Sequence, residues 1–212
     1  HAIEIEKVQL NDLEAWVWDM GGQEVYHGTH RLFMKSEALY VVVWDALTET
    51  QTSAPDRADA QYDNRHHKVP YWVDVIKAVS PESPILLVQN KIDESEADYS
   101  YCRTLVDDNL AISAAKGDNI DELKHKIERL AKMHPPLRYG MEVPSTWWAV
   151  RSYMLEHISK RSNNNALSAT ISEKQFKGLC KVYEVMEKTS PSLLRLLHRS
   201  GIVFHQANNW LA

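Results

Sequence analysis

The sequence predicts an α/β fold, in which a parallel sheet with flanking helices is followed by a small, mainly helical domain. Two continuous apolar runs, at residues 39–44 and 85–88, have the pattern of strands that are covered on both faces. Stretches with helical spacing alternate with these strands, as in parallel sheets. Residues 1–136 hold 14 Lys and Arg against 24 Asp and Glu, whereas residues 137–212 hold 10 against 5. Two units of opposite net charge are therefore expected.

The first unit begins with a predicted hairpin. Apolar and charged residues alternate in residues 3–10, a turn follows, and residues 15–18 form the returning strand. Residues 39–44 form the next strand, and the polar stretch at residues 48–68 has the composition of a surface loop. The remainder alternates between the two types of element, with a helix at residues 71–79, strands at 85–88 and 109–113, and a helix at 119–133.

The proline pair at residues 135–136 marks the boundary of the second unit, because neither ring nitrogen can donate a hydrogen bond within a helix. Ser172 and Gln175 have the spacing of a capping box, and Ser190 is a candidate cap before a proline. Gly201 then stops the last helix, and an apolar strand follows it. The second unit is predicted to contain helices at residues 145–158, 172–183 and 190–200 and a strand at 202–206.

Helices followed by a strand resemble a winged helix, which raises DNA binding as an alternative function. The net charge of the second unit would favour an anionic partner. Its third helix, however, offers only Arg195, His198 and Arg199 as long or basic polar side chains. These are too few to neutralise several phosphates and also contact base edges. We therefore expect no nucleic-acid partner, and we interpret the basic face as a docking surface for the acidic first unit or for another protein.

The composition is that of a globular protein without a membrane span. Hydrophobic residues make up 44% of the chain and charged residues 25%. The longest apolar run, residues 38–44, is too short to cross a bilayer. The first ten residues lack the basic start and apolar core of a signal peptide. Cys102 and Cys180 form neither a CxxC pair nor a disulfide framework. We expect a cytoplasmic protein.

Polar clusters follow three of the predicted strands, and ligands of parallel sheets bind outside the carboxyl ends of the strands. The first cluster is DMGGQE. Asp19 is suited to hold Mg²⁺, usually through water, and Gly22 lets a backbone N–H approach a terminal phosphate without a side chain in the way. Gln23 is suited to orient an attacking water. Taken alone, this motif is also typical of a tight turn.

The other two clusters are suited to a guanine base. In QNKIDE, Asp93 can accept from the ring N–H and the exocyclic amine, Asn90 can bond the opposite edge, and the Lys91 stem can lie over the ring. In SAAKGD, Ser113 and Ala114 can place a backbone N–H on the guanine carbonyl. NKID alone is equally typical of a helix-capping turn. The order of the three clusters, each after an apolar strand, favours a guanine-nucleotide site.

This constellation resembles a Ras-superfamily GTPase. The stretch WDMGGQEVYHGTHRLFMKSEALYVVVWD is similar to the Roc domain of Roco proteins, and the likeness includes His27, His30, Phe33 and Met34. The two histidines also raise the alternative of a metal pair. No third ligand is placed by the sequence, so we expect them to pack within a switch segment instead.

The second unit extends the resemblance to the COR domain, which follows Roc in Roco proteins. The likeness to the start of COR rests on LLRLLHRSGIVFHQ and on Pro144, Ser145, Trp147, Val150 and Arg151. The resemblance implies a Ras-like sheet, with a Roc domain at residues 1–135 and the N-terminal part of COR at residues 136–212. It also implies a switch that binds GTP or GDP with Mg²⁺ and hydrolyses GTP. Its partners would be other domains of a signalling protein, with homodimerisation through COR in the intact parent.

Two departures from the family pattern affect the expected activity. Ala115 would line the nucleotide site where the family commonly has a lysine, so base stacking from that side would be lost. No GxxxxGK[ST] motif occurs in the 212 residues. We expect the first strand, phosphate loop, first helix and first switch to be missing from this sequence, and the chain by itself to bind GTP feebly and to be inactive. The alternative function is a non-hydrolysing nucleotide-binding or protein-interaction scaffold.

Overall fold

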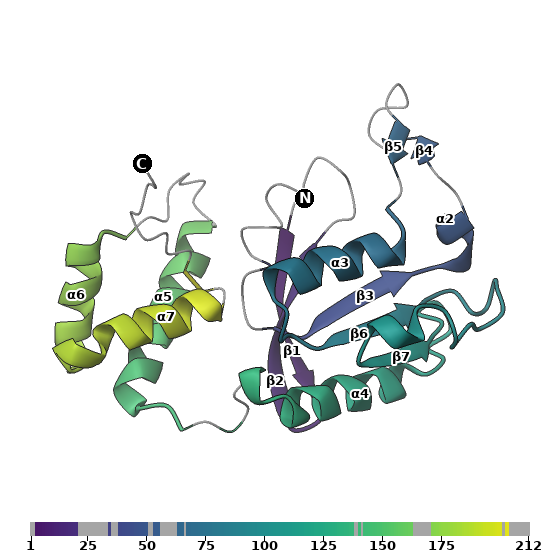
Figure 1. The fold of residues 1–212 in the computed structure, drawn as a ribbon. Helices are drawn as coiled ribbons and strands as arrows, with labels where there is room; N and C mark the ends of the chain where they lie inside the picture. The colour runs from purple at the N-terminus through teal and green to yellow at the C-terminus, as the bar shows by residue number, and fades with distance from the viewer. Residues whose placement is uncertain are drawn as a thin grey trace. The chain divides into compact units, whose positions relative to one another are not determined.

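The computed structural model divides the chain into two compact units, His1–Gly140 and Met141–Ala212, each described here by itself (Figure 1). The residues that the structure describes are 3–20, 34, 38–50, 53–55, 63–65, 67–137, 140, 142–162, 171–200 and 202–203.

The first unit starts with an antiparallel hairpin, as predicted. Strand β1 (Ile3–Leu10) pairs along its whole length with strand β2 (Leu13–Met20), and Leu10 lies opposite Leu13 at the turn. Alternation places Trp16 and Trp18 in half-buried positions, whereas Val17 is exposed. The hairpin is a sheet of its own and is not hydrogen-bonded to the strands that follow it.

Three parallel strands form the central sheet in the order β3-β6-β7, and this confirms the predicted α/β architecture. Strand β6 (Ile85–Gln89) lies between β3 (Tyr40–Trp44) and β7 (Asp108–Ala111), and all five of its residues are buried. Its continuous apolar run is explained by this central position, because each face of the strand packs against a different helix. Strand β3 is at the edge of this sheet, and Val41 and Val43 are exposed.

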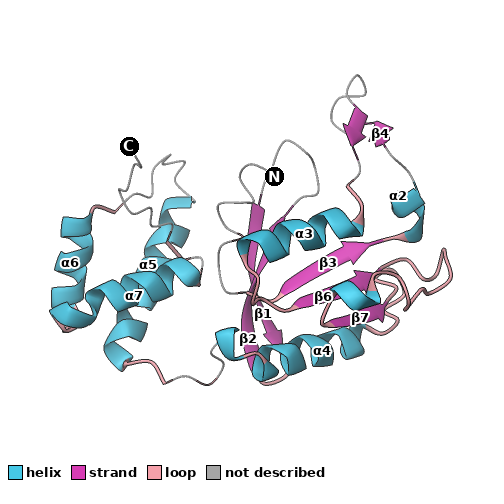
Figure 2. Ribbon diagram, viewed as in Figure 1, coloured by secondary structure: helices cyan, strands magenta, loops and turns pink. Residues whose placement is uncertain are grey.

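Two amphipathic helices cover opposite faces of the sheet (Figure 2). Helix α3 (Val69–Val79) packs its buried face, which includes Val73 and Ile76, against Ile85 and Leu87 of β6. The other side chains of β6, Leu86 and Val88, pack in a second cluster that contains Leu130 of helix α4 (Ile120–Met133). The period of two along the strand therefore divides β6 between two cores.

The polar stretch between β3 and α3 contains more regular structure than the predicted loop. Helix α2 (Ala46–Thr50) follows β3, and two short strands, β4 (Ser53–Pro55) and β5 (Asp63–Arg65), pair antiparallel. Each of these strands has only three residues, Ser-Ala-Pro in β4 and Asp-Asn-Arg in β5, and three residues are too few to show the period-two pattern of a strand. Short 3-10 turns also occur at Arg103–Leu105 and Pro135–Leu137.

The second unit contains helices α5 (Ser145–Ser162), α6 (Glu173–Val182) and α7 (Ser190–Arg199), with a 3-10 turn at Glu187–Thr189. The predicted capping box is confirmed, since Ser172 accepts from the Gln175 N–H and the Gln175 side chain accepts from the Ser172 N–H. The core consists of Val150, Met154, Phe176, Cys180, Val185, Leu193, Leu197 and Ile202.

Two predictions for the end of this unit have different outcomes. Ser190 is the first residue of α7 and Thr189 is its cap, so the cap assigned to Ser190 was wrong by one position. The physical reason is that Pro191 is tolerated at the second helical position as well as the first, because neither N–H has a partner within the helix. Of the predicted strand at 202–206, only residues 202–203 are described, and they are not in a strand.

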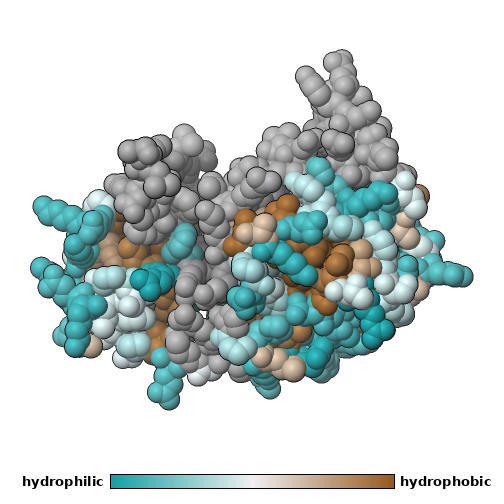
Figure 3. Space-filling view, viewed as in Figure 1, coloured by the Kyte–Doolittle hydropathy of each residue, from teal (hydrophilic) through white to brown (hydrophobic). Residues whose placement is uncertain are grey.

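Apolar residues reach the surface of each unit on the face drawn in Figure 3. The most exposed large apolar side chains include Val43 in β3 and, in the second unit, Val182 and Met186, which are 60%, 75% and 61% exposed. Within the described ranges, no helix is both long and apolar enough to span a membrane.

Candidate guanine-binding site

The pairing of the central strands brings their carboxyl ends to one edge of the sheet. Gln89, the last residue of β6, lies opposite Trp44 of β3 and Ala111 of β7. The chain continues this alignment beyond the strands, because the Asn90 N–H donates to the Trp44 carbonyl at 2.8 Å and the Ile112 N–H donates to the Gln89 carbonyl at 2.8 Å. The segments that follow β6 and β7 therefore lie side by side.

Side chains from these two segments form one hydrogen-bond network. The Ser113 hydroxyl donates to Asp93 Oδ1 at 2.7 Å, and the Ala114 N–H donates to Asn90 Oδ1 at 3.0 Å. Asn90 Oδ1 also accepts from the Lys91 N–H at 2.8 Å, and the left-handed backbone of Lys91 (φ +63°) makes the sharp turn between Asn90 and Asp93. The structure thus joins the two clusters that the sequence assigned to a guanine base.

The electrostatics of this network favour an ionised Asp93. The hydrogen bond from the Ser113 hydroxyl lowers the pKa of the Asp93 carboxyl, and the positive charges of Lys116 and Lys91 lower it further. Ser113 is fully buried, whereas Asp93 keeps part of its surface in solvent. An ionised carboxylate only accepts hydrogen bonds, so Asp93 presents acceptor atoms to any ligand at this edge.

Part of the chain matches a known domain family. The family model "Roc: Ras of Complex, Roc, domain of DAPkinase" matches residues 1–93. The probable serine/threonine-protein kinase roco5 of Dictyostelium discoideum is 27% identical over 170 residues, which cover 74% of this chain and 6% of that protein. The probable serine/threonine-protein kinase pats1 of the same organism is 24% identical over 207 residues, which cover 90% of this chain and 6% of that protein.

The fold of the chain is similar to that of a solved structure. The RocCORdC structure of Methanosarcina barkeri Roco2 bound to GDP superposes with a TM-score of 0.69 at 22% identity, over 99% of this chain and 59% of that one. This chain resembles a Roc–COR segment of Roco proteins. The predicted resemblance and the predicted fold class are therefore confirmed. The chain spans only 6% of the length of roco5 and pats1.

If this candidate site binds GDP, the acid limb of binding is expected to depend on Ser113. A carboxyl with a lowered folded-state pKa keeps its charge until the pH falls through that pKa, so affinity should persist well into the acid range. Ser113→Ala removes the main cause of the lowering and should move the loss of affinity to higher pH. Titration of GDP binding by the intact parent protein between about pH 3 and 7 measures this shift.

Ser100→Ala is the matched control, because its hydroxyl donates to a different carboxylate, Asp98, at 2.6 Å. Its acid limb should coincide with that of the wild type. Coincident profiles for wild type and Ser113→Ala would contradict the role given to Ser113.

Two polar residues at this edge of the sheet were given no role by the sequence analysis. Gln89 is 1% exposed, and its side chain donates to the Glu96 carbonyl at 2.8 Å and accepts from the Asp98 N–H at 2.6 Å, so it holds the loop after NKID. Asp45 Oδ2 lies 3.1 Å from the Lys91 Nζ. The signal was available, because Asp45 directly follows the predicted strand at 39–44 and ligand sites form after such strands.

The predicted phosphate side of the site is described only in part. Asp19 lies near the end of β2, where it pairs with Glu4 of β1, and its carboxylate is exposed and forms no hydrogen bond or ion pair with another described residue. The structure therefore does not join Asp19 to the guanine cluster. Gly22 and Gln23 fall outside the described residues, as do His27, His30 and Phe33.

Metal binding has no support beyond Asp19 itself. Where the structure is described, no group of three or more His, Cys, Asp and Glu side chains could hold a metal ion. A single carboxylate is nevertheless the donor set expected for Mg²⁺, which keeps several waters and takes its other ligands from phosphates. The role of Asp19 remains a prediction.

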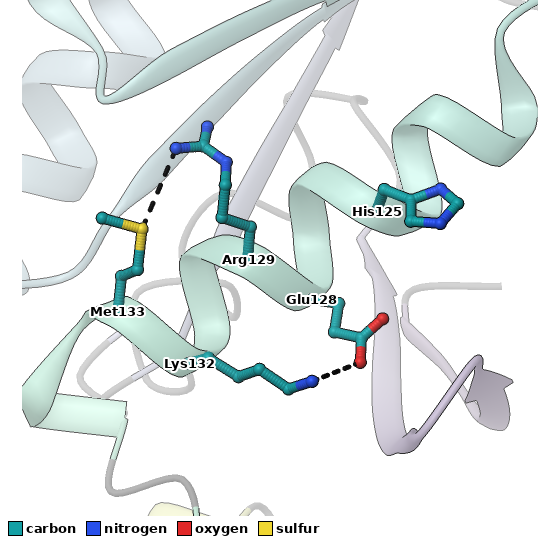
Figure 4. A pocket seen from close by; sticks show the side chains of 5 residues that line it. All are labelled: His125, Glu128, Arg129, Lys132 and Met133. Atoms are coloured by element: carbon teal, nitrogen blue, oxygen red, sulfur yellow. Dashed lines mark hydrogen bonds and ion pairs between the residues drawn. The ribbon is translucent and has the colours of Figure 1, made fainter.

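A hollow on the surface of α4 lies away from this site (Figure 4). It measures about 400 Å³, is open to solvent, and all five of its lining residues come from α4: His125, Glu128, Arg129, Lys132 and Met133. Arg129 pairs with Asp108 at the start of β7, so the hollow is near the amino ends of the strands. Lys132 is paired with Glu128 at 2.6 Å. The hollow is therefore separate from the polar network at the carboxyl ends of β6 and β7, which stays the candidate site.

Proposed function

We propose that this Roc–COR segment is the GTP-binding and GTP-hydrolysing switch of a multidomain Roco signalling protein. The observation that carries the proposal is the network of Asn90, Asp93, Ser113 and Ala114 at the carboxyl ends of β6 and β7. The Roc family match supports it, as does the GDP in the similar Roco2 structure.

The guanine base is recognised by complementary hydrogen bonds in this proposal. Asp93 accepts from the ring N–H and the exocyclic amine, Asn90 bonds the opposite edge, and the Lys91 stem covers one face of the ring. An N–H of Ala114 or Ala115 bonds the guanine carbonyl. Adenine carries an amine in place of that carbonyl and has no N–H for Asp93, so the same groups would reject it.

The reaction itself takes place at the terminal phosphate. Asp19 helps to hold Mg²⁺ through water, the Gly22 N–H contacts the phosphate, and Gln23 orients the attacking water. Bound Mg²⁺ would neutralise charge on the phosphate oxygens. We assign the activity to the intact parent protein, because a GxxxxGK[ST] motif is absent from the 212 residues.

The organisation of the chain is part of the proposal. Residues 1–135 form the Roc domain and residues 136–212 the first part of COR, which is supported by the two units that meet after Gly140. Other domains of the same protein and a second copy bound through COR are the proposed partners. The proposed cytoplasmic location is supported by two cysteines that remain free thiols.

Gln23→Ala is expected to lower kcat for GTP by about tenfold or more in the intact parent, because the attacking water loses its orientation. The affinity for GDP should change much less. GDP, and not ADP, should compete with a labelled guanine nucleotide. Gln175→Ala, in the capping box of the second unit, is the control and should leave turnover at the wild-type level.

A protein-interaction scaffold that does not hydrolyse GTP is the second candidate. It is favoured by the exposed Val182 and Met186 of the second unit, which are 75% and 61% exposed. Nucleotide binding without turnover in the intact parent would select it over the switch.

DNA binding by the basic unit predicts an affinity that falls steeply with salt, so a flat salt response removes that alternative.

A further inference from the structure

Asp45 and Lys91 come from strands that are neighbours in the sheet. Trp44, the last residue of β3, lies opposite Gln89, the last residue of β6. Each strand is followed at once by a polar segment, and the Asn90 N–H donates to the Trp44 carbonyl at 2.8 Å. The residue after β3 therefore lies beside the NKID segment.

The Asp45 carboxylate is held in place from two directions. Its Oδ1 accepts from the Thr48 N–H at 2.9 Å, so Asp45 caps the start of α2, and its Oδ2 lies 3.1 Å from the Lys91 Nζ. The side chain of Asp45 is only 15% exposed, whereas that of Lys91 is 45% exposed. A fixed, mostly covered carboxylate thus holds the end of a longer and more exposed side chain.

The Asp45 carboxylate remains charged at neutral pH. Burial raises the pKa of Asp45, but the hydrogen bonds from Thr48 and Lys91 and the charge of Lys91 outweigh burial, so the pKa is lowered overall. The Asp45 carboxylate is therefore ionised at neutral pH and can hold the Lys91 Nζ, which lies 3.1 Å from it.

We propose that Asp45 is a positioning residue for the guanine base: it holds the Lys91 ammonium so that the Lys91 stem forms a fixed apolar wall beside Asn90 and Asp93. The inference rests on the proposed function and deepens it, since Asp45 itself touches neither base nor phosphate. A free lysine side chain samples many rotamers, and binding under a purine would restrict it. The ion pair with Asp45 already restricts the Lys91 side chain in the free protein, so less conformational entropy is lost when the nucleotide binds.

The test compares nucleotide affinities in the intact parent protein. Asp45→Asn keeps the helix cap, because asparagine is as good a cap as aspartate, but it removes the charge that holds Lys91. We expect the Kd for GDP to rise about three- to tenfold. The KM for GTP should rise by a similar factor with a smaller change in kcat. Asp45→Ser, which also caps helices, is the second variant and should behave in the same way.

Lys91→Met separates positioning from a purely structural role. Methionine keeps an apolar stem without the ammonium, so Asp45→Asn should change the Kd for GDP by less than about twofold in the Lys91→Met background. An equal loss in both backgrounds would overturn the inference, as would unchanged affinity in Asp45→Asn and Asp45→Ser.

Failure of the inference can be distinguished from failure of the proposed function. If the intact parent binds no guanine nucleotide, the proposed function is wrong and the role of Asp45 falls with it. If the parent binds GDP and the Asp45 variants bind it equally well, only the role of Asp45 is overturned.

Discussion

Replacing Asp93 by asparagine is expected to lower the affinity of the intact parent protein for GDP by roughly 100-fold or more, because two hydrogen bonds to an ionised acceptor are lost together. Asparagine has nearly the shape of aspartate, but it carries an NH₂ group in place of one carboxylate oxygen. This NH₂ group is a hydrogen-bond donor and would face the ring N–H and the exocyclic amine of guanine, which are donors too. The fully buried Ser113 hydroxyl donates to Asp93 Oδ1 at 2.7 Å. This hydrogen bond holds the side chain at position 93, so the asparagine cannot easily rotate away from the base.

The same substitution should improve binding of a xanthine nucleotide relative to GDP. Xanthine carries a carbonyl where guanine carries its amine, so the asparagine NH₂ finds an acceptor there. Isothermal titration with GDP and with xanthosine diphosphate measures both changes. Asp98→Asn is the matched control, because Asp98 is a carboxylate of the following loop whose side chain, among the residues that the structure describes, bonds Ser100 and Tyr101. Equal GDP affinity in Asp93→Asn and wild type would show that the base is not read here.

The central strands could be predicted because their signal is local. β6 is buried on both faces and therefore shows an unbroken apolar run, and the helices α3 and α4 show helical spacing because one face of each is covered. The short strands β4 and β5 could not be predicted, because each consists of three residues whose pairing depends on the opposite strand. Their stability comes from tertiary context that no window of the sequence contains.

The chemistry of the site could also be predicted in part. Asp93 and Ser113 were assigned to one ligand on motif order alone, and the structure places them in direct contact at 2.7 Å. The pairing of Asp45 with Lys91 was beyond reach, because it depends on which residues of β3 and β6 are opposite each other. Register is a long-range property, and a shift by one residue would turn Asp45 to the other face.

Leu193→Ala is expected to destabilise the second unit by about 2 to 5 kcal/mol. Leu193 is 0% exposed and belongs to the core that joins α7 to α5 and α6 through residues such as Val150 and Phe176. Truncation removes buried methyl groups and leaves a cavity that the packed helices cannot close without losing other contacts. Hydrogen exchange of the amides of α5, α6 and α7 measures the loss of stability in this unit separately from the first.

Val182→Ala is the matched control, because it truncates an apolar side chain of the same unit that is 75% exposed, and it should change stability by less than about 0.5 kcal/mol. Equal protection in Leu193→Ala and wild type would contradict the core assignment.

The outcome also bears on the DNA-binding alternative. Leu193 and Leu197 are buried on the apolar face of α7, whereas Arg195 is exposed to solvent. The exposed face of α7 therefore offers few basic side chains to DNA. If Leu193→Ala destabilises the unit and Arg195→Ala leaves the affinity for DNA unchanged, α7 serves the core of the unit and does not bind DNA. This is the result expected for the start of COR.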